Sequence, residues 1–205
     1  MANANRPSGL SPVKHLNGSP FNGQANLYQI AAADTNGYAI GDAVKSTGNA
    51  DANGVAGVTL ATATGALRGV IVGLGISTGN SLAFEAGLFN PNNLNQTIRP
   101  SGAQPTDWYA LVVDSPDVIF EIQEGNDATP LTAASVGLNA NLYLGVANNG
   151  FQSGMQFDAT TALGTSTLQL KLLGLARRQD NAFGASSKWL VTINAHELAP
   201  NTAGV

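Results

Sequence analysis

The stretch that decides the fold is Trp108-Tyr-Ala-Leu-Val-Val-Asp-Ser-Pro-Asp-Val-Ile-Phe-Glu-Ile-Gln-Glu124. Two apolar runs, rich in β-branched and aromatic residues, flank the tetrapeptide Asp114-Ser-Pro-Asp117. Proline after serine suits the second position of a type I turn, and aspartate supports such a turn with its side chain. The stretch therefore predicts a β-hairpin with strands over residues 108–114 and 118–124.

The same pattern of short apolar runs broken by Gly, Asn, Asp and Pro continues from Ala25 onward and favours strands over helices. Many short strands joined by regular turns indicate an all-β fold, here a β-sandwich or barrel-like body of the jelly-roll or β-tulip kind, over residues 25–205. Besides the hairpin, the predicted strands are 27–30, 43–45, 55–62, 67–73, 141–145, 154–157, 168–176 and 188–195.

Two of these strands also predict which faces are buried. The run Gly69-Val-Ile-Val-Gly73 is apolar on both faces, so we expect it in the centre of the fold or against a neighbouring subunit. In Thr167-Leu-Gln-Leu-Lys-Leu172 the leucines alternate with polar residues. That alternation predicts one buried face and one solvated face.

Residues 1–24 have a different composition, with Pro7, Pro12 and Pro20 among Asn, Gly and Ser. Proline fixes φ and removes a backbone donor, so the segment is predicted to be an extended N-terminal arm. Its large apolar residues are too sparse to build a core but well spaced to fill pockets on another surface. A disordered tail is the alternative. The apolar residues of the arm are Leu10, Val13, Leu16 and Phe21.

Composition narrows the classes of function. The chain has 205 residues with 43% hydrophobic residues, enough for one main domain. Charged residues make up 11% of the chain, against about 25% in ordinary soluble proteins. Because surface charge keeps free proteins apart, this low value favours a subunit of a larger assembly. The net charge is −4 and the basic residues are scattered apart from Arg177-Arg178, so we expect no direct nucleic-acid binding.

Other features bear on compartment and chemistry. Cysteine is absent, which excludes disulfides and thiolate chemistry. No apolar run approaches the roughly 18 residues that span a bilayer, and the start lacks the apolar region of a leader, so we expect no membrane partner and synthesis in the cytoplasm.

Two motifs resemble functional sites. Gly75-Ile-Ser-Thr-Gly79 matches the G-x-S-x-G pattern, with His196 downstream, but the hydrolase fold needs parallel strands alternating with helices, so a turn is favoured. Asn49-Ala-Asp-Ala-Asn-Gly54 resembles half of a calcium loop, but Leu60 stands where a bidentate glutamate is needed. A plain Asn/Asp/Gly turn is favoured over structural calcium.

The remaining histidines, glutamates and aromatic residues are also predicted to have structural roles and no catalytic or binding role. His15 and His196 lack metal-like spacing, and Glu121 and Glu124, three apart on a strand, should point to opposite faces. The strand aromatics Trp108 and Tyr109 favour core packing over a stacking platform. We therefore predict no enzyme, no catalytic residues, no metal and no cofactor.

Both ends of the chain resemble segments of a known family. These are Asn3-Ala-Asn-Arg-Pro-Ser-Gly-Leu-Ser-Pro-Val-Lys-His-Leu-Asn-Gly18, Gly174-Leu-Ala-Arg-Arg-Gln-Asp-Asn-Ala-Phe-Gly184 and Lys188-Trp-Leu-Val-Thr-Ile-Asn194. They resemble tailed-bacteriophage capsid decoration, or cement, proteins among the head structural proteins. The resemblance implies a homo-oligomer, dimer or trimer, on the capsid exterior of the virion.

In such a protein the partner is the phage major capsid protein. The resemblance implies binding to the outside of an HK97-type shell and bridging of neighbouring subunits against internal DNA pressure. The expected docking residues are the four apolar residues of the arm, with Arg6 and Lys14 meeting acidic groups on the shell. The alternative is a tail or receptor-binding virion component with a carbohydrate-binding β-domain that uses Trp108, Tyr109 or the loop 90–105.

Overall fold

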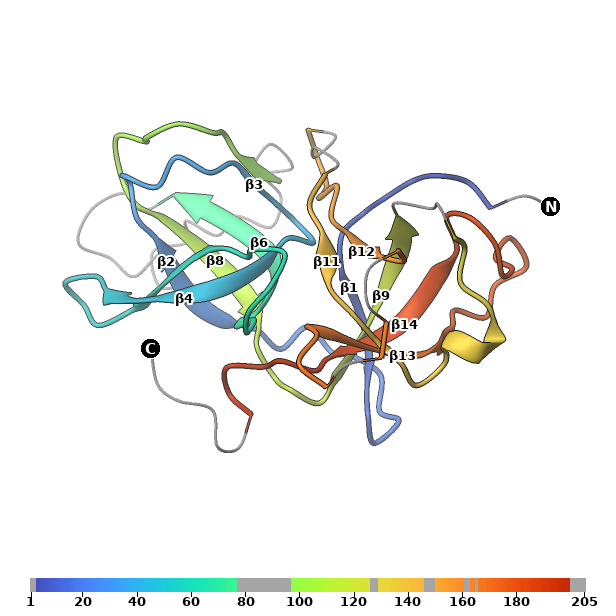
Figure 1. Cartoon of the computed structure of the whole chain (residues 1–205). Coiled ribbons are helices and arrows are strands. Elements are labelled where there is room, and N and C mark those ends of the chain that lie inside the picture. Colours follow the sequence, from blue (N-terminus) through green and yellow to red (C-terminus); the bar gives the residue numbers. More distant parts are fainter. Residues whose placement is uncertain are drawn as a thin grey trace.

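The computed structural model describes residues 3–76, 97–125, 129–145, 150–160, 163–164 and 166–199. In this part of the chain the only helix is a short 3₁₀ turn, Ala133–Ser135, and the regular structure is otherwise β, which confirms the predicted all-β class. Figure 1 shows two groups of strands beside each other, a closed barrel and a seven-stranded sheet. None of the described residues forms a helix long and apolar enough to cross a membrane.

The barrel contains five strands, and its interior is filled by side chains such as Ile30, Val44 and Val112. Its neighbouring strands are antiparallel except for one parallel pair, β2 with β5. A two-stranded sheet lies outside the closed barrel path. In order around the barrel the strands are β2 (Asn26–Ile30), β5 (Ala56–Leu60), β4 (Ala43–Ala50), β6 (Gly69–Ile76) and β8 (Trp108–Val113), and the small sheet is β3 (Tyr38–Ala39) with β7 (Ile98–Arg99).

The seven-stranded sheet is built around β9 (Val118–Gly125), in which every residue is buried. One edge of β9 pairs with β14. Its other edge pairs first with β1 and then, in parallel, with β12. The other strands of this sheet are β1 (Ser11–His15), β10 (Asn139–Ala140), β11 (Leu142–Tyr143), β12 (Gln156–Asp158), β13 (Leu170–Leu175) and β14 (Lys188–Ile193).

A second, larger core joins the sheet to the barrel. Phe120 and Trp189 of the sheet belong to the same buried cluster as Val70 and Val113 of the barrel. The barrel strand β6 serves both cores, because Val70 lies in the shared cluster and Ile71 lies in the barrel interior. Both edges of β6 are also paired, with β4 and with β8.

The central position predicted for residues 69–73 is therefore confirmed. The strand is apolar on both faces because it separates two cores of its own chain. Self-association through this strand, which its two apolar faces suggested, does not fit the structure. Assembly into a dimer or trimer stays a prediction and needs another surface.

The predicted hairpin around Asp114-Ser-Pro-Asp117 is wrong. The turn forms, with the amide of Val118 donating to the carbonyl oxygen of Ser115 at 3.3 Å. However, β8 pairs with barrel strands and β9 pairs with strands of the seven-stranded sheet, so the turn links the barrel to the sheet. Turn chemistry fixes a local reversal, whereas burial and long-range pairing decide which strands become neighbours.

The N-terminal segment is extended, as predicted, but it lies on the body. Strand β1 pairs antiparallel with β9, and the amide of Leu10 donates to the carbonyl oxygen of Gly41 at 2.9 Å. The side chain of Leu10 is 1% exposed and belongs to the larger core. The expectation that the apolar residues of this segment stay outside a core is therefore wrong for Leu10.

The solvated face predicted for residues 167–172 is partly wrong. Lys171 is exposed and Leu170 and Leu172 are buried, as the alternation indicates. Gln169 is fully buried. Its amide nitrogen donates to the carbonyl oxygens of Thr62 at 3.0 Å and Gly65 at 3.1 Å, so it joins the sheet to a barrel loop.

Candidate docking surface

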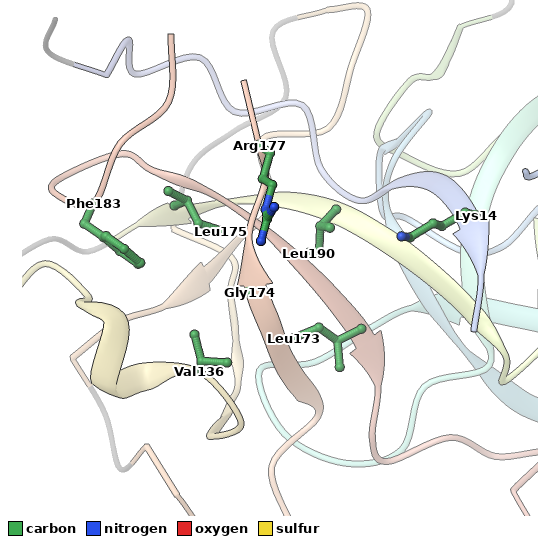
Figure 2. A pocket seen from close by; sticks show the side chains of 8 residues that line it. All are labelled: Lys14, Val136, Leu173, Gly174, Leu175, Arg177, Phe183 and Leu190. Carbon is green, nitrogen blue, oxygen red and sulfur yellow. The ribbon is translucent and has the colours of Figure 1, made fainter. Parts of the chain in front are cut away.

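The outer face of the seven-stranded sheet carries an open groove of about 820 Å³ over β13 and β14 (Figure 2). Its apolar lining comes from both strands, from the residue after the 3₁₀ turn and from the loop before β14. All of these side chains retain some exposure to solvent. The apolar residues are Val136, Leu173, Leu175, Phe183 and Leu190.

Strand alternation and a bulge place Leu190 and Leu173 on this face, whereas Leu175, the ladder partner of Trp189, packs partly buried against the larger core. Trp189 and Val191 of β14 are buried in the core, so Leu190 between them points to the opposite face. In β13, Leu172 pairs with Val191 and Gly174 pairs with Leu190, which leaves Leu173 as the extra residue of a β-bulge. Bulges change the direction of side chains, and here Leu173 joins Leu190 on the solvent side.

Phe183 contributes a half-exposed ring to the groove. The ring also packs against Trp189, with 5.7 Å between the ring centroids. Val136 is similarly half-exposed and directly follows the 3₁₀ turn. The apolar surface is therefore held by the core beneath it and is not carried by long, freely moving side chains.

Two cations stand at the groove, Lys14 from β1 and Arg177 after β13. Figure 2 shows Leu190 between their charged groups. Within the described part of the chain, the side chains of Lys14 and Arg177 have no ion pair or hydrogen bond. By contrast, Arg178 and Lys188 lie 2.7 Å and 3.8 Å from the carboxylate of Glu121.

The predicted docking residues of the N-terminal segment have different surroundings. Leu10 is in the core, whereas Val13 and Leu16 are 42% and 55% exposed. Phe21 packs partly buried against the larger core. Only Lys14 lines the groove. Arg6 lines a separate, smaller hollow with Asp180 and Lys188.

Apart from Lys14, the groove residues were not predicted from the sequence; they include Leu173, Leu190, Arg177 and Phe183. A signal exists for Leu190, because it stands between Trp189 and Val191 in a strand of alternating faces. No comparable signal exists for Leu173. Its outward position depends on a bulge whose place follows from the pairing of β13 with β14.

In the described part of the chain, residues of the motifs that resemble hydrolase and calcium sites accept hydrogen bonds from backbone amides. Ser77 lies outside the described residues. His196 is buried, which lowers the pKa of its imidazole, and its Nδ1 accepts a hydrogen bond from the amide of Leu198 at 3.0 Å. The carboxylate of Asp51 accepts hydrogen bonds from the amides of Asn53 and Val55, as expected for a plain turn.

The paired glutamates lie on opposite faces of β9, as predicted. Glu121 is on the outer face beside Arg178. Glu124 is fully buried and accepts hydrogen bonds from the hydroxyl of Ser187 at 2.6 Å and the indole of Trp189 at 3.2 Å. Among the described residues, no group of three or more His, Asp or Glu side chains is arranged to hold a metal ion.

The aromatic residues considered for carbohydrate stacking are buried. Trp108 belongs to the barrel core, and the hydroxyl of Tyr109 donates to the carboxylate of Asp51 at 2.6 Å. This confirms core packing for these rings and removes them as an exposed platform. Of the loop 90–105, residues 90–96 lie outside the described residues.

Comparisons with models of protein families, with curated proteins and with solved structures gave no match.

Proposed function

We propose that the chain is a decoration, or cement, protein of a tailed-phage head. In this role it binds the outside of an HK97-type major capsid shell and bridges neighbouring subunits. The resemblance of residues 3–18, 174–184 and 188–194 to such proteins supports the proposal. The protein then resides on the capsid exterior of the virion and assembles there as a dimer or trimer.

The observation that carries the proposal is that the resembling segments, far apart in sequence, build one surface. Lys14 of the first segment lies at the groove whose other walls include Arg177 and Leu190 of the later ones. The ends also hold each other directly, because the side chain of Asn3 donates to the carbonyl oxygen of Ala182 at 2.8 Å and accepts from its amide at 3.0 Å.

This surface suits attachment to another protein. Burial of exposed apolar area contributes roughly 25 cal/mol per Å², and the groove and the exposed Leu16 offer such area. A shell presents many equivalent sites, and copies that touch two subunits gain from multivalency. Modest contacts per copy are therefore enough for reinforcement of a shell.

The test is co-sedimentation of the full chain with head particles prepared without it. We expect saturable binding by the wild-type protein and at least tenfold weaker binding by the double variant Val13→Ser/Leu16→Ser. Leu198→Ser is the matched control, because Leu198 is 46% exposed but lies outside the resembling segments. We use point substitutions and not deletion of the N-terminal segment, because deletion would remove Leu10 from the core.

Absence of wild-type binding at any concentration rejects the proposed function. Binding of Val13→Ser/Leu16→Ser equal to that of Leu198→Ser rejects a docking role for these two residues.

A further inference from the structure

We propose that the groove over β13 and β14 binds an extended segment of the partner protein that carries both apolar side chains and acidic side chains. The identity of the partner as the capsid protein rests on the proposed function. The chemistry of the bound segment rests on the groove itself.

The floor selects apolar side chains. Leu173 and Leu190 form it beside the partly buried Leu175, and the backbones of all three belong to paired strands of the sheet. An occupant that removes these leucines from water gains free energy in proportion to the apolar area it covers. A sugar–phosphate backbone has no such side chains, so the floor favours a peptide over a nucleic acid.

The cations select the charge. Lys14 and Arg177 flank the floor without a carboxylate partner in the described part of the chain, although the chain as a whole has a net charge of −4. Glu121 is the ladder partner of Leu190, but Arg178 and Lys188 already surround its carboxylate. The groove is therefore locally positive, and acidic side chains on the occupant complement it.

The shape selects an extended occupant. The groove runs from Lys14 on β1, past Leu190, to Arg177 beyond the end of β13 (Figure 2). An extended peptide points alternate side chains to opposite faces, so leucine-like residues can contact the floor while flanking carboxylates reach the two cations.

The first test uses three synthetic heptapeptides as probes of the full-length protein in solution NMR. The peptides are Glu-Leu-Ser-Leu-Ser-Leu-Glu, a version with lysine in place of glutamate, and a version with serine in place of leucine. We expect the first peptide to shift the amide signals of Leu173, Leu190 and Arg177. The other two peptides are expected to bind at least tenfold more weakly.

Charge-reversal variants make this test specific. Lys14→Glu and Arg177→Glu should each weaken binding of the acidic peptide about tenfold and improve binding of the lysine peptide. Lys45→Glu, the same charge change on the barrel strand β4, should leave both affinities unchanged. Equal effects of the three substitutions would overturn the proposal, since they would report only net charge.

Two further arms test the class of occupant. A short DNA duplex and vesicles containing anionic phospholipid are titrated against the same amide signals. Tighter binding of either one than of the acidic peptide overturns the assignment of a peptide occupant. Weaker binding supports it.

The same variants in the head-particle assay separate the two proposals. If wild-type protein binds particles and Lys14→Glu and Arg177→Glu bind like Lys45→Glu, the groove assignment is wrong and the proposed function stands. If wild-type protein does not bind particles but the peptide results hold, the proposed function is wrong and the groove assignment stands.

Discussion

Asp42 lies buried where the barrel, the sheet and the N-terminal segment meet. Its carboxylate accepts a hydrogen bond from the amide of Ala39 at 2.7 Å. Burial raises the pKa of Asp42 to about 6, although hydrogen bonds from Ser153 and Ala39 act in the opposite direction. The folded protein therefore binds a proton at this site more tightly than the unfolded chain does.

The sign of the pH effect follows from this raised pKa. Between about pH 4 and pH 6 the native state holds more protons at Asp42 than the unfolded state, so the free energy of unfolding falls as pH rises. A shift of about two pKa units corresponds to roughly 3 kcal/mol at most. Asp42→Asn, which keeps the acceptor for Ala39, should abolish this dependence and raise the stability at pH 7. Urea unfolding at a series of pH values measures both effects.

The control is Asp117→Asn, because Asp117 is exposed in the turn that links the two units. In Asp34 and Asp51, hydrogen bonds to the carboxylate outweigh desolvation and lower the pKa. Their contributions to the free energy of unfolding are therefore lost only at lower pH. The same slope between pH 4 and pH 6 in wild type and Asp42→Asn would contradict the prediction.

Among the elements, strands with strong patterns were predictable and those with weak patterns were not. Each of the ten strand regions expected from residue 27 onward contains a strand in the structure. The strands that were missed are β1, β3, β7 and β10. Three of these are only two residues long, and β1 contains Pro12, whose missing donor and nearby bulge hide the period of a strand.

Because the N-terminal segment lies against the body, substitution of its glycines Gly9 and Gly18 should lower the stability by different amounts. Gly9 has φ of 66°, and a Cβ at this position would lie 2.2 Å from the carbonyl oxygen of Gly41. Gly18 has φ of 90° but open space around it. Gly18→Ala should therefore cost only the backbone strain, about 1 kcal/mol, and Gly9→Ala should cost about 2 kcal/mol more.

Chemical denaturation of the two glycine variants measures the difference. Equal losses of stability would mean that the segment does not lie against Gly41, and the N-terminal segment would then be a free arm as the sequence alone suggests.

At the scale of the whole molecule, the groove depends on contacts between distant segments, which local sequence patterns do not encode. The apolar spacing of the N-terminal segment correctly indicated exposed groups at Val13 and Leu16. It could not indicate that Lys14 lies beside Leu190, because that depends on the pairing of β9 with both β1 and β14. Within the candidate site, Lys14 was therefore predictable as a docking residue, and the residues that surround it were not.

The barrel and the sheet are expected to unfold as one cooperative unit. They share a buried core, and they are joined by hydrogen bonds from Ser46 to Glu197 and from Gln169 to the barrel loop. The two tryptophans report on the two units separately, since Trp108 lies in the barrel and Trp189 in the sheet. Trp108→Phe and Trp189→Phe each leave a single fluorescent reporter.

The decisive substitution in these backgrounds is Gln169→Leu. It leaves the carbonyl oxygens of Thr62 and Gly65 without the Gln169 donor, and it removes the acceptor of the buried Leu142 amide, at a cost of about 1 to 3 kcal/mol. We expect the midpoints of urea unfolding seen by the two reporters to coincide and to fall together in Gln169→Leu. Lys171→Leu, an exposed position two residues further along the chain, is the control and should change neither midpoint by more than a small amount. A lower unfolding midpoint for only one of the two tryptophan reporters would mean that the barrel and the sheet are independent folding units. The groove on the sheet could then form without the barrel.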